Sequence, residues 1–167
     1  MSKLLALAVS IAVLGGVWAF LALNPLAGLA LVWVGFIAWG CFFHSGGDTC
    51  ALQKTIAGMS FGAVMAAIAL ALVSGGALSG LGALGAPVII AVTVFPLVIV
   101  SSVNLLSVVP ANVYGYAATA GLGLTAGTAG DATAMALSNP ALLVIISTVL
   151  GAVFGLASGK LAGVLGK

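Results

Sequence analysis

Long apolar runs separated by short breaks rich in glycine, proline or asparagine dominate this sequence. A helix needs roughly 20 mostly apolar residues to cross the hydrocarbon core of a bilayer. Only 4% of the 167 residues are charged and 63% are hydrophobic, whereas a soluble domain carries about 25% charged residues. The sequence therefore predicts an all-α membrane protein in contact with the lipid bilayer, without a separate soluble domain.

Six of the apolar runs are predicted to be transmembrane helices. The first is longer than the apolar part of a cleavable signal peptide, which has about 7–15 residues. Asn24-Pro25 and Asn139-Pro140 each precede a run, as is typical of a capped helix start. The predicted spans are Leu4–Leu23, Leu26–Phe43, Thr55–Val73, Pro87–Leu106, Val108–Leu124 and Pro140–Ala157.

The few charges predict an orientation. With six crossings and a cytoplasmic N-terminus, all four lysines fall on the cytoplasmic side and Asp131 falls outside, as the positive-inside rule requires. Both termini are then cytoplasmic. The net charge of +2 is too small and too dispersed to indicate nucleic-acid binding, so no nucleic-acid partner is predicted. The lysines are Lys3, Lys54, Lys160 and Lys167.

Two pairs of matching segments indicate an internal repeat. Trp39-Gly40 matches Tyr114-Gly115, and Phe61–Val64 matches Leu150–Val153. The predicted repeats are residues 1–73 and 87–167, each with three helices. Because three is odd, the repeats must lie upside down relative to one another, the inverted plan of many transporters and channels. The matches are short and rich in glycine and alanine, so chance similarity is the alternative.

Glycines at four-residue spacing predict close helix packing. Gly58 and Gly62 show this spacing in the third span, and four glycines show it along the last helix. Small residues at this spacing let two helix backbones approach closely in lipid. The contact is either inside one bundle or between subunits, and a homo-oligomer is predicted. These four glycines are Gly151 and Gly155 in the last span, and Gly159 and Gly163 in the helix that continues it.

The segment Trp39–Lys54 gathers rare residue types at the end of the second span. It holds the only histidine, both cysteines and one of the two aspartates. Polar groups beside a membrane span are costly, so they indicate function. His44 is alternatively an interfacial side chain, and the Gly-Gly pair either makes a tight turn or exposes backbone groups to a solute. The candidate substrate-path residues here are Trp39, Phe43, His44, Ser45, Gly46 and Gly47.

A polar stripe marks the fifth span. Asn112, Tyr116 and Thr119 share one helix face, and such stripes face the protein interior or a water-filled path. Hydrogen bonding to a neighbouring helix is the alternative. If the repeat is real, this face meets the face of His44, and a narrow path is expected between the second and fifth spans.

Metal binding and catalysis are weaker interpretations. Cys41, His44, Asp48 and Cys50 lie within ten residues, but their spacing matches no zinc pattern, and Cys50 is expected in a cytoplasmic loop. A catalytic Cys–His pair would need a geometry that the sequence does not define. No metal, other cofactor or enzymatic activity is therefore predicted.

The absence of ionisable residues from the middle of the spans restricts the function. Proton relays and ion-coupled carriers usually need such a residue. Aromatic rings, hydroxyls and an amide suit a small uncharged polar solute, such as urea, an amide or ammonia. A channel or facilitator is predicted. The alternatives are a non-transporting membrane interaction subunit and, less favoured, a metal-binding membrane protein or membrane enzyme.

The chain also resembles a known family. The resemblance rests on Val108–Gly115 with the following Ala117-Ala118-Thr119, on the aromatic second span ending in Gly46-Gly47, and on Leu150–Gly155. These segments are similar to the YcdZ-like bacterial inner-membrane proteins, the domain-of-unknown-function family 1097. The resemblance implies an inner-membrane location and no established activity. His44-Ser45 departs from the cysteine-proline type of sequence that the family has there, so the resemblance implies no family-wide role for His44.

Overall fold

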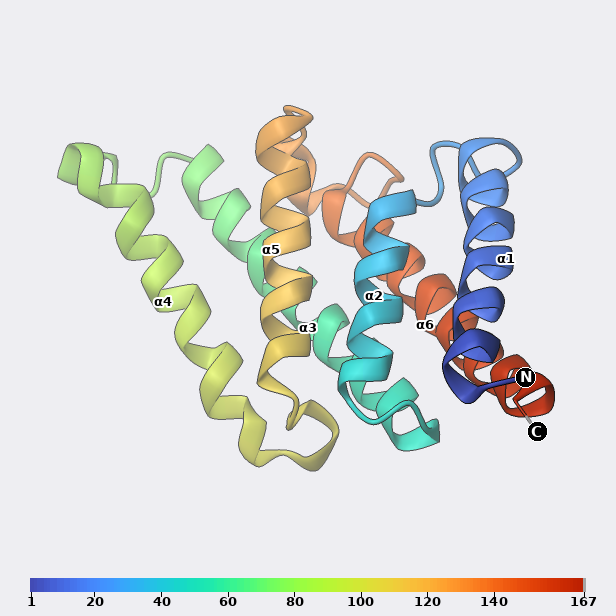
Figure 1. Cartoon of the computed structure of the whole chain (residues 1–167). Coiled ribbons are helices and arrows are strands. Elements are labelled where there is room, and N and C mark those ends of the chain that lie inside the picture. The colour runs from blue at the N-terminus through green and yellow to red at the C-terminus, as the bar shows by residue number, and fades with distance from the viewer. Residues whose placement is uncertain (167) are drawn as a thin grey trace. The chain divides into compact units, whose positions relative to one another are not determined.

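The computed structural model describes residues 1–166, and within this range the chain is all-α (Figure 1). The predicted class and the six α-helices are confirmed, while Lys167 lies outside the described residues. The helices are α1 (Lys3–Leu23), α2 (Val32–His44), α3 (Thr49–Ser74), α4 (Gly85–Ile99), α5 (Val109–Thr125) and α6 (Pro140–Leu165). Four 3-10 segments join them: η1 (Ser79–Leu84), η2 (Val100–Ser102), η3 (Asn104–Leu106) and η4 (Ala129–Thr133).

Four of the helical stretches are long and apolar enough to cross a membrane, which makes the chain a multi-pass membrane protein. They are α1, α3, the stretch Ser79–Ser102 around α4, and α6. The helix α2 is apolar but has only 13 residues, or about 20 Å of length. The helix α5 has 17 residues, or about 25 Å.

The predicted start of the second span at Leu26 is wrong, because α2 begins at Val32. Gly28 has φ +80° in the intervening turn, a conformation that no α-helix contains. Asn24 caps the preceding helix instead, since its side-chain amide donates to Phe20 O at 2.9 Å. The predicted cap at Asn139 is confirmed, because its Oδ1 accepts from the backbone N–H of Ala141 at 2.9 Å.

The predicted loop before the third span is too long. Asp48 Oδ1 accepts from the backbone N–H of Ala51 at 2.7 Å, and α3 begins at Thr49. This bond satisfies a free amide of the first turn. Cys50 and Lys54 are therefore helical, and the expectation that Cys50 lies in a loop is wrong.

The ends of two later helices also differ from the predicted spans. The helix α4 ends at Ile99 rather than Leu106, because the chain continues in 3-10 turns and is extended at Val103 (φ −83°, ψ 123°). The helix α6 continues past Ala157 to Leu165. No polar cap or proline interrupts α6 between these residues, so the helix runs on.

The chain forms two compact units. Unit 1 comprises residues 1–56 and the chain from Ile146 onward, and unit 2 comprises residues 57–145. Both α3 and α6 contribute to both units. The predicted boundaries 1–73 and 87–167 describe sequence repeats rather than packed units, and they stay a prediction.

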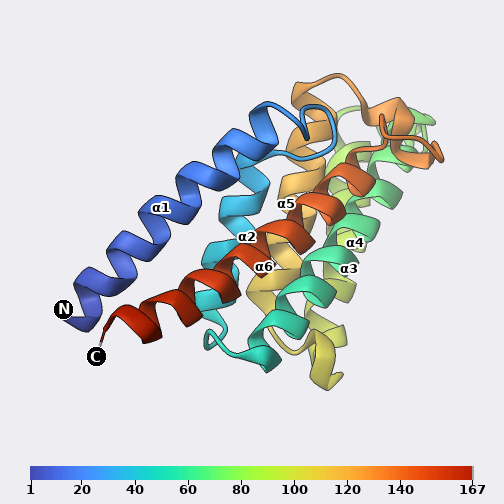
Figure 2. The same cartoon turned by 90° about the vertical axis from the view of Figure 1, so that its right-hand side faces the viewer.

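In unit 1, glycines bring α2 against α6. A Cβ added to Gly151 would overlap the backbone of Gly35, and one added to Gly155 would lie 2.9 Å from the ring of Phe42. Trp18 covers Gly35 from α1 and donates its indole N–H to Val32 O at 3.0 Å. The N-terminal amine lies beside the end of α6, 3.5 Å from Leu165 O (Figure 2).

In unit 2, glycines bring α5 against α3. A Cβ on Gly62 would overlap Asn112 O, and one on Gly115 would overlap Met59 O. The two helix backbones thus pack directly against each other at these glycines, where a side chain would not fit. Packing inside one bundle is confirmed for Gly58, Gly62, Gly151 and Gly155, whereas a Cβ on Gly163 would meet no atom within 4 Å. The buried core of unit 2 is Ala66, Ala69, Ile89, Leu97 and Tyr116.

Candidate functional site

The Gly-Gly pair after α2 ends the helix. Gly46 (φ +121°) and Gly47 (φ +71°) have positive φ, which suits glycine at a helix C-terminus. The N–H of Gly47 donates to Phe42 O at 3.0 Å, and that of Gly46 donates to Phe43 O at 3.2 Å. Of the two interpretations of this pair, the tight turn is confirmed. Both amides are occupied within the turn.

The neighbouring residues line an open pocket of unit 1, with a volume of about 410 Å³. Phe43 is half-buried there, and Lys3 supplies the charged side chain of the lining. Ser45 points back into its own helix, since its hydroxyl donates to Cys41 O at 2.8 Å. The lining residues are Lys3, Leu7, Phe43, Gly46, Gly47, Gly159, Ala162, Gly163 and Gly166.

His44 and the two cysteines have different surroundings. His44 and Cys50 are exposed, whereas Cys41 is buried and its sulfur accepts from Thr55 Oγ1 at 3.6 Å. Asp48 is engaged in capping α3. Within residues 1–166, no group of three or more histidine, cysteine, aspartate or glutamate side chains is arranged to hold a metal ion.

Trp39 is a buried structural residue of unit 1. Its indole N–H donates to Ser158 Oγ at 3.0 Å, and Ser158 in turn donates to Gly155 O at 2.8 Å. A buried indole N–H without a partner would be costly. The indole N–H of Trp39 is thus already bonded to α6, and the rest of the ring is apolar.

Asn112 is fully buried and ties α5 to α4. Its side-chain amide donates to Leu97 O at 2.8 Å and to Leu106 O at 3.1 Å. Leu97 is among the last residues of α4, whose carbonyls lack a partner within their own helix. The interpretation of Asn112 as a hydrogen bond to a neighbouring helix is therefore confirmed. Its Oδ1 has no hydrogen-bond partner in the described chain and lies against Gly58.

Tyr116 makes a second bond from α5 to α4. Its hydroxyl lies 2.9 Å from Thr93 Oγ1, and the Thr93 hydroxyl is also 2.8 Å from Ile89 O. A proton donated by Thr93 to Ile89 leaves its oxygen free to accept from Tyr116. Like Trp39, Tyr116 has its polar atom engaged by another helix.

Thr119 and Thr148 stand apart from the other helix hydroxyls. Both residues are fully buried, and neither Oγ1 has a hydrogen-bond partner within residues 1–166. By contrast, Ser10, Thr93 and Thr125 each lie 2.7–2.8 Å from the carbonyl four residues earlier. A buried hydroxyl without a partner costs about 1–3 kcal/mol. Each of these two hydroxyls therefore has a donor and an acceptor that no group of the described chain uses.

Comparison with known proteins identifies the family but not the activity. The model of the protein-of-unknown-function family DUF1097 matches residues 8–163. The chain belongs to the DUF1097 family. No curated protein and no solved structure matches it. For this DUF1097 protein, function must therefore be argued from its own residues.

The predicted site residues of this DUF1097 protein divide between the two units. Unit 1 contains Trp39 and the segment Phe43–Gly47, and unit 2 contains Asn112, Tyr116 and Thr119. The expectation that the His44 and Thr119 faces meet stays a prediction. Sequence reasoning missed Thr148, Ser158 and Thr93. Thr148 follows Ser147 in an apolar run, and this polar pair is the only sequence signal for it.

Proposed function

We propose that this DUF1097 protein is a channel or facilitator for a small uncharged polar solute of the urea, amide or ammonia class. The observation that carries the proposal is that each unit contains a buried hydroxyl without a partner in the described chain, Thr148 in unit 1 and Thr119 in unit 2. A neutral solute that leaves water loses hydrogen bonds, which such hydroxyls replace along a path. The absence of ionisable side chains from the middle of the spans favours a neutral solute over an ion.

The proposal includes an inverted-repeat architecture, which the order of buried positions along the chain supports. Residues 34–45 of the α2 region and 111–122 of α5 have the same order of buried, half-buried and exposed positions. This alignment pairs Trp39 with Tyr116, two residues later than the match of Trp39-Gly40 to Tyr114-Gly115. Residues 51–69 and 140–158 also agree, except at two positions. Their register pairs Gly62 with Gly151, as the sequence match does. Two three-helix repeats are expected to have opposite orientations.

The chain is further proposed to lie in a bacterial inner membrane, with six crossings and both termini in the cytoplasm. The positions of the lysines relative to the helices support this orientation. The short helices α2 and α5 would each cross the membrane together with the apolar segments on either side of them. The chain is also proposed to act as a homo-oligomer, whose subunit number native mass spectrometry would give.

Replacing Thr119 or Thr148 by valine tests, for each unit separately, whether the hydroxyl contributes to solute passage. Valine has nearly the shape of threonine without the hydroxyl, so we expect flux of the transported solute to fall by about tenfold, a barrier change of about 1.4 kcal/mol. Stability should be unchanged or raised, because no hydrogen bond within the chain is lost. Stopped-flow light scattering on proteoliposomes with urea, formamide, glycerol and ammonia gradients measures the flux.

Thr93→Val is the matched control. It removes a hydroxyl that is engaged by Tyr116, so it should lower thermal stability without the selective loss of flux. Normal flux in both Thr119→Val and Thr148→Val would exclude these hydroxyls from the path. Wild-type proteoliposomes without accelerated flux of any solute would exclude facilitation and favour an interaction subunit.

Cysteine labelling tests the crossings. Cys50 is exposed at the start of α3, and Ser138 is exposed just before α6. Three crossings separate them, so a membrane-impermeant maleimide should label Ser138→Cys in intact cells, in a chain with Cys50→Ser, and Cys50 only after permeabilisation. Buried Cys41 serves as the unlabelled control. Labelling of both positions from one side would show that one of the three helices, with the short α5 the first suspect, does not cross.

A further inference from the structure

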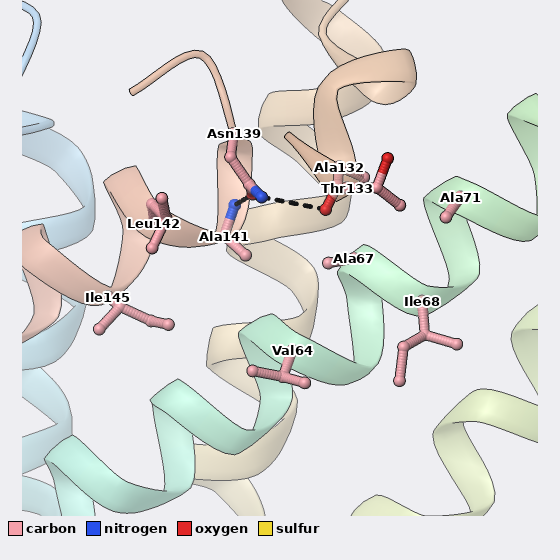
Figure 3. A pocket seen from close by; sticks show the side chains of 10 residues that line it. All are labelled: Val64, Ala67, Ile68, Ala71, Ala132, Thr133, Asn139, Ala141, Leu142 and Ile145. Atoms are coloured by element: carbon pink, nitrogen blue, oxygen red, sulfur yellow. Dashed lines mark hydrogen bonds between the residues drawn. The ribbon is translucent and has the colours of Figure 1, made fainter. Parts of the chain in front are cut away.

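Unit 2 contains an open groove with a volume of about 400 Å³ (Figure 3). This is within the range of ligand pockets, roughly 300–1,000 Å³. One wall is a face of α3, and the other is formed by η4 and the first turns of α6. The residues that line it are Val64, Ala67, Ile68, Ala71, Ala132, Thr133, Asn139, Ala141, Leu142 and Ile145.

The groove offers a ligand almost no polar contact. The side-chain amide of Asn139 donates to Ala132 O at 3.0 Å and to Ala134 O at 2.9 Å, and its Oδ1 accepts from the N–H of Ala141. The lining includes four alanines, and its Val64 and Ile68 side chains are 48% and 44% exposed. An apolar groove between two membrane helices is suited to a hydrocarbon chain.

The charge of Asp131 indicates which polar head group the hydrocarbon chain would carry. Asp131 directly precedes the lining residue Ala132 in η4 and is half-buried, so it is the charged residue next to the groove along the chain. Residues 57–145 contain no lysine, arginine or histidine, and Asp131 is the only charged side chain among them. No described residue of unit 2 can neutralise it. A cationic group on the ligand would complement this carboxylate.

We propose that the groove binds a membrane phospholipid, with one acyl chain against α3 and an ammonium head group beside Asp131. An acyl chain fits the apolar walls, and an ammonium group would pair with the carboxylate of Asp131, for which unit 2 contains no cationic side chain. The site is independent of the proposed solute path, because neither Thr119 nor Thr148 lines it.

Native mass spectrometry of the full chain in detergent tests this site with dioleoyl phosphatidylethanolamine and dioleoyl phosphatidylglycerol as probes. The wild type should bind the ethanolamine lipid about fivefold more tightly, the effect of one ammonium–carboxylate pair near a membrane surface. Asp131→Asn should remove this preference and leave chain binding intact. Ala67→Phe should fill the groove and abolish retention of either lipid.

Ala91→Phe provides the control, since Ala91 is an exposed small residue of α4 outside the groove. Retention of lipid by Ala67→Phe at the wild-type level, or no head-group preference in the wild type, would overturn the proposal. A dimer that is lost in Ala67→Phe, without any bound lipid in the wild type, would assign the groove to a second copy of the chain. If Ala67→Phe does not fold, the comparison of Asp131→Asn with the wild type still decides the head-group contact.

Discussion

Replacing Gly115 by alanine is expected to destabilise the protein by about 1–3 kcal/mol or more, as overpacking of a buried site does. The added Cβ would overlap the carbonyl oxygen of Met59 and lie 2.6 Å from its Cα. These are backbone atoms inside α3, so they cannot rotate away as a flexible side chain can. The α3–α5 contact must separate to accept a single methyl group.

Gly121→Ala is the matched control, because it makes the same change in the same helix. A Cβ at Gly121 would meet no atom within 4 Å, so the variant should be neutral or more stable by about 0.5–1 kcal/mol through helix propensity. Thermal unfolding in detergent, monitored by circular dichroism, measures the stability of both variants. Equal changes in the unfolding temperature of the two variants would contradict the close packing of α3 and α5.

Gly151 extends the same argument to unit 1, where a Cβ would overlap the backbone of Gly35. The spacing of small residues predicted such contacts from the sequence. The spacing could not identify which residues these glycines contact, because it describes only the helix that carries them and not the surface packed against it. Gly155 illustrates the difference, since it packs against the ring of Phe42 rather than against a second glycine.

The positions of the helix ends were less predictable from the sequence than the segments that form helices. Asn24-Pro25 and Asn139-Pro140 are the same dipeptide, yet Asn24 caps the end of α1 and Asn139 the start of α6. A side-chain amide can donate to the carbonyls behind it or accept from the amides ahead of it. Which end it caps depends on the residues that follow, and here Gly28 turns the chain before α2 begins.

The polar residues of α5 were predictable, but their partners were not. Helical spacing places Asn112 and Tyr116 on one face, and the structure shows both bonded to α4. The partner atoms, Leu97 O and Thr93 Oγ1, carry no sequence signal: one is a backbone carbonyl and the other a hydroxyl that could bond within its own helix. Thr119 was predictable as a polar position, while its lack of a partner is a property of packing alone.

Asn112→Asp should cost about 1–3 kcal/mol of stability, from the loss of two inter-element hydrogen bonds. Aspartate keeps the shape of asparagine but replaces the donating NH₂ by an oxygen. That oxygen would face Leu97 O and Leu106 O, which now accept at 2.8 and 3.1 Å. Asn112→Ala removes the same donors without this repulsion, so it should be no more destabilising than Asn112→Asp despite the larger change in volume.

Asn24→Ala is the control that separates the loss of the buried Asn112 hydrogen bonds from the general cost of losing an asparagine. Asn24 also donates to one carbonyl, but it does so at an exposed helix end where water can replace it, so the loss should be within about 0.5 kcal/mol. Thermal unfolding of the three variants in one detergent gives the comparison. If Asn112→Asp were as mild as Asn24→Ala, Asn112 would not hold the end of α4. The amide would then be available for a solute, and the polar stripe of α5 would regain the role that its spacing first predicted.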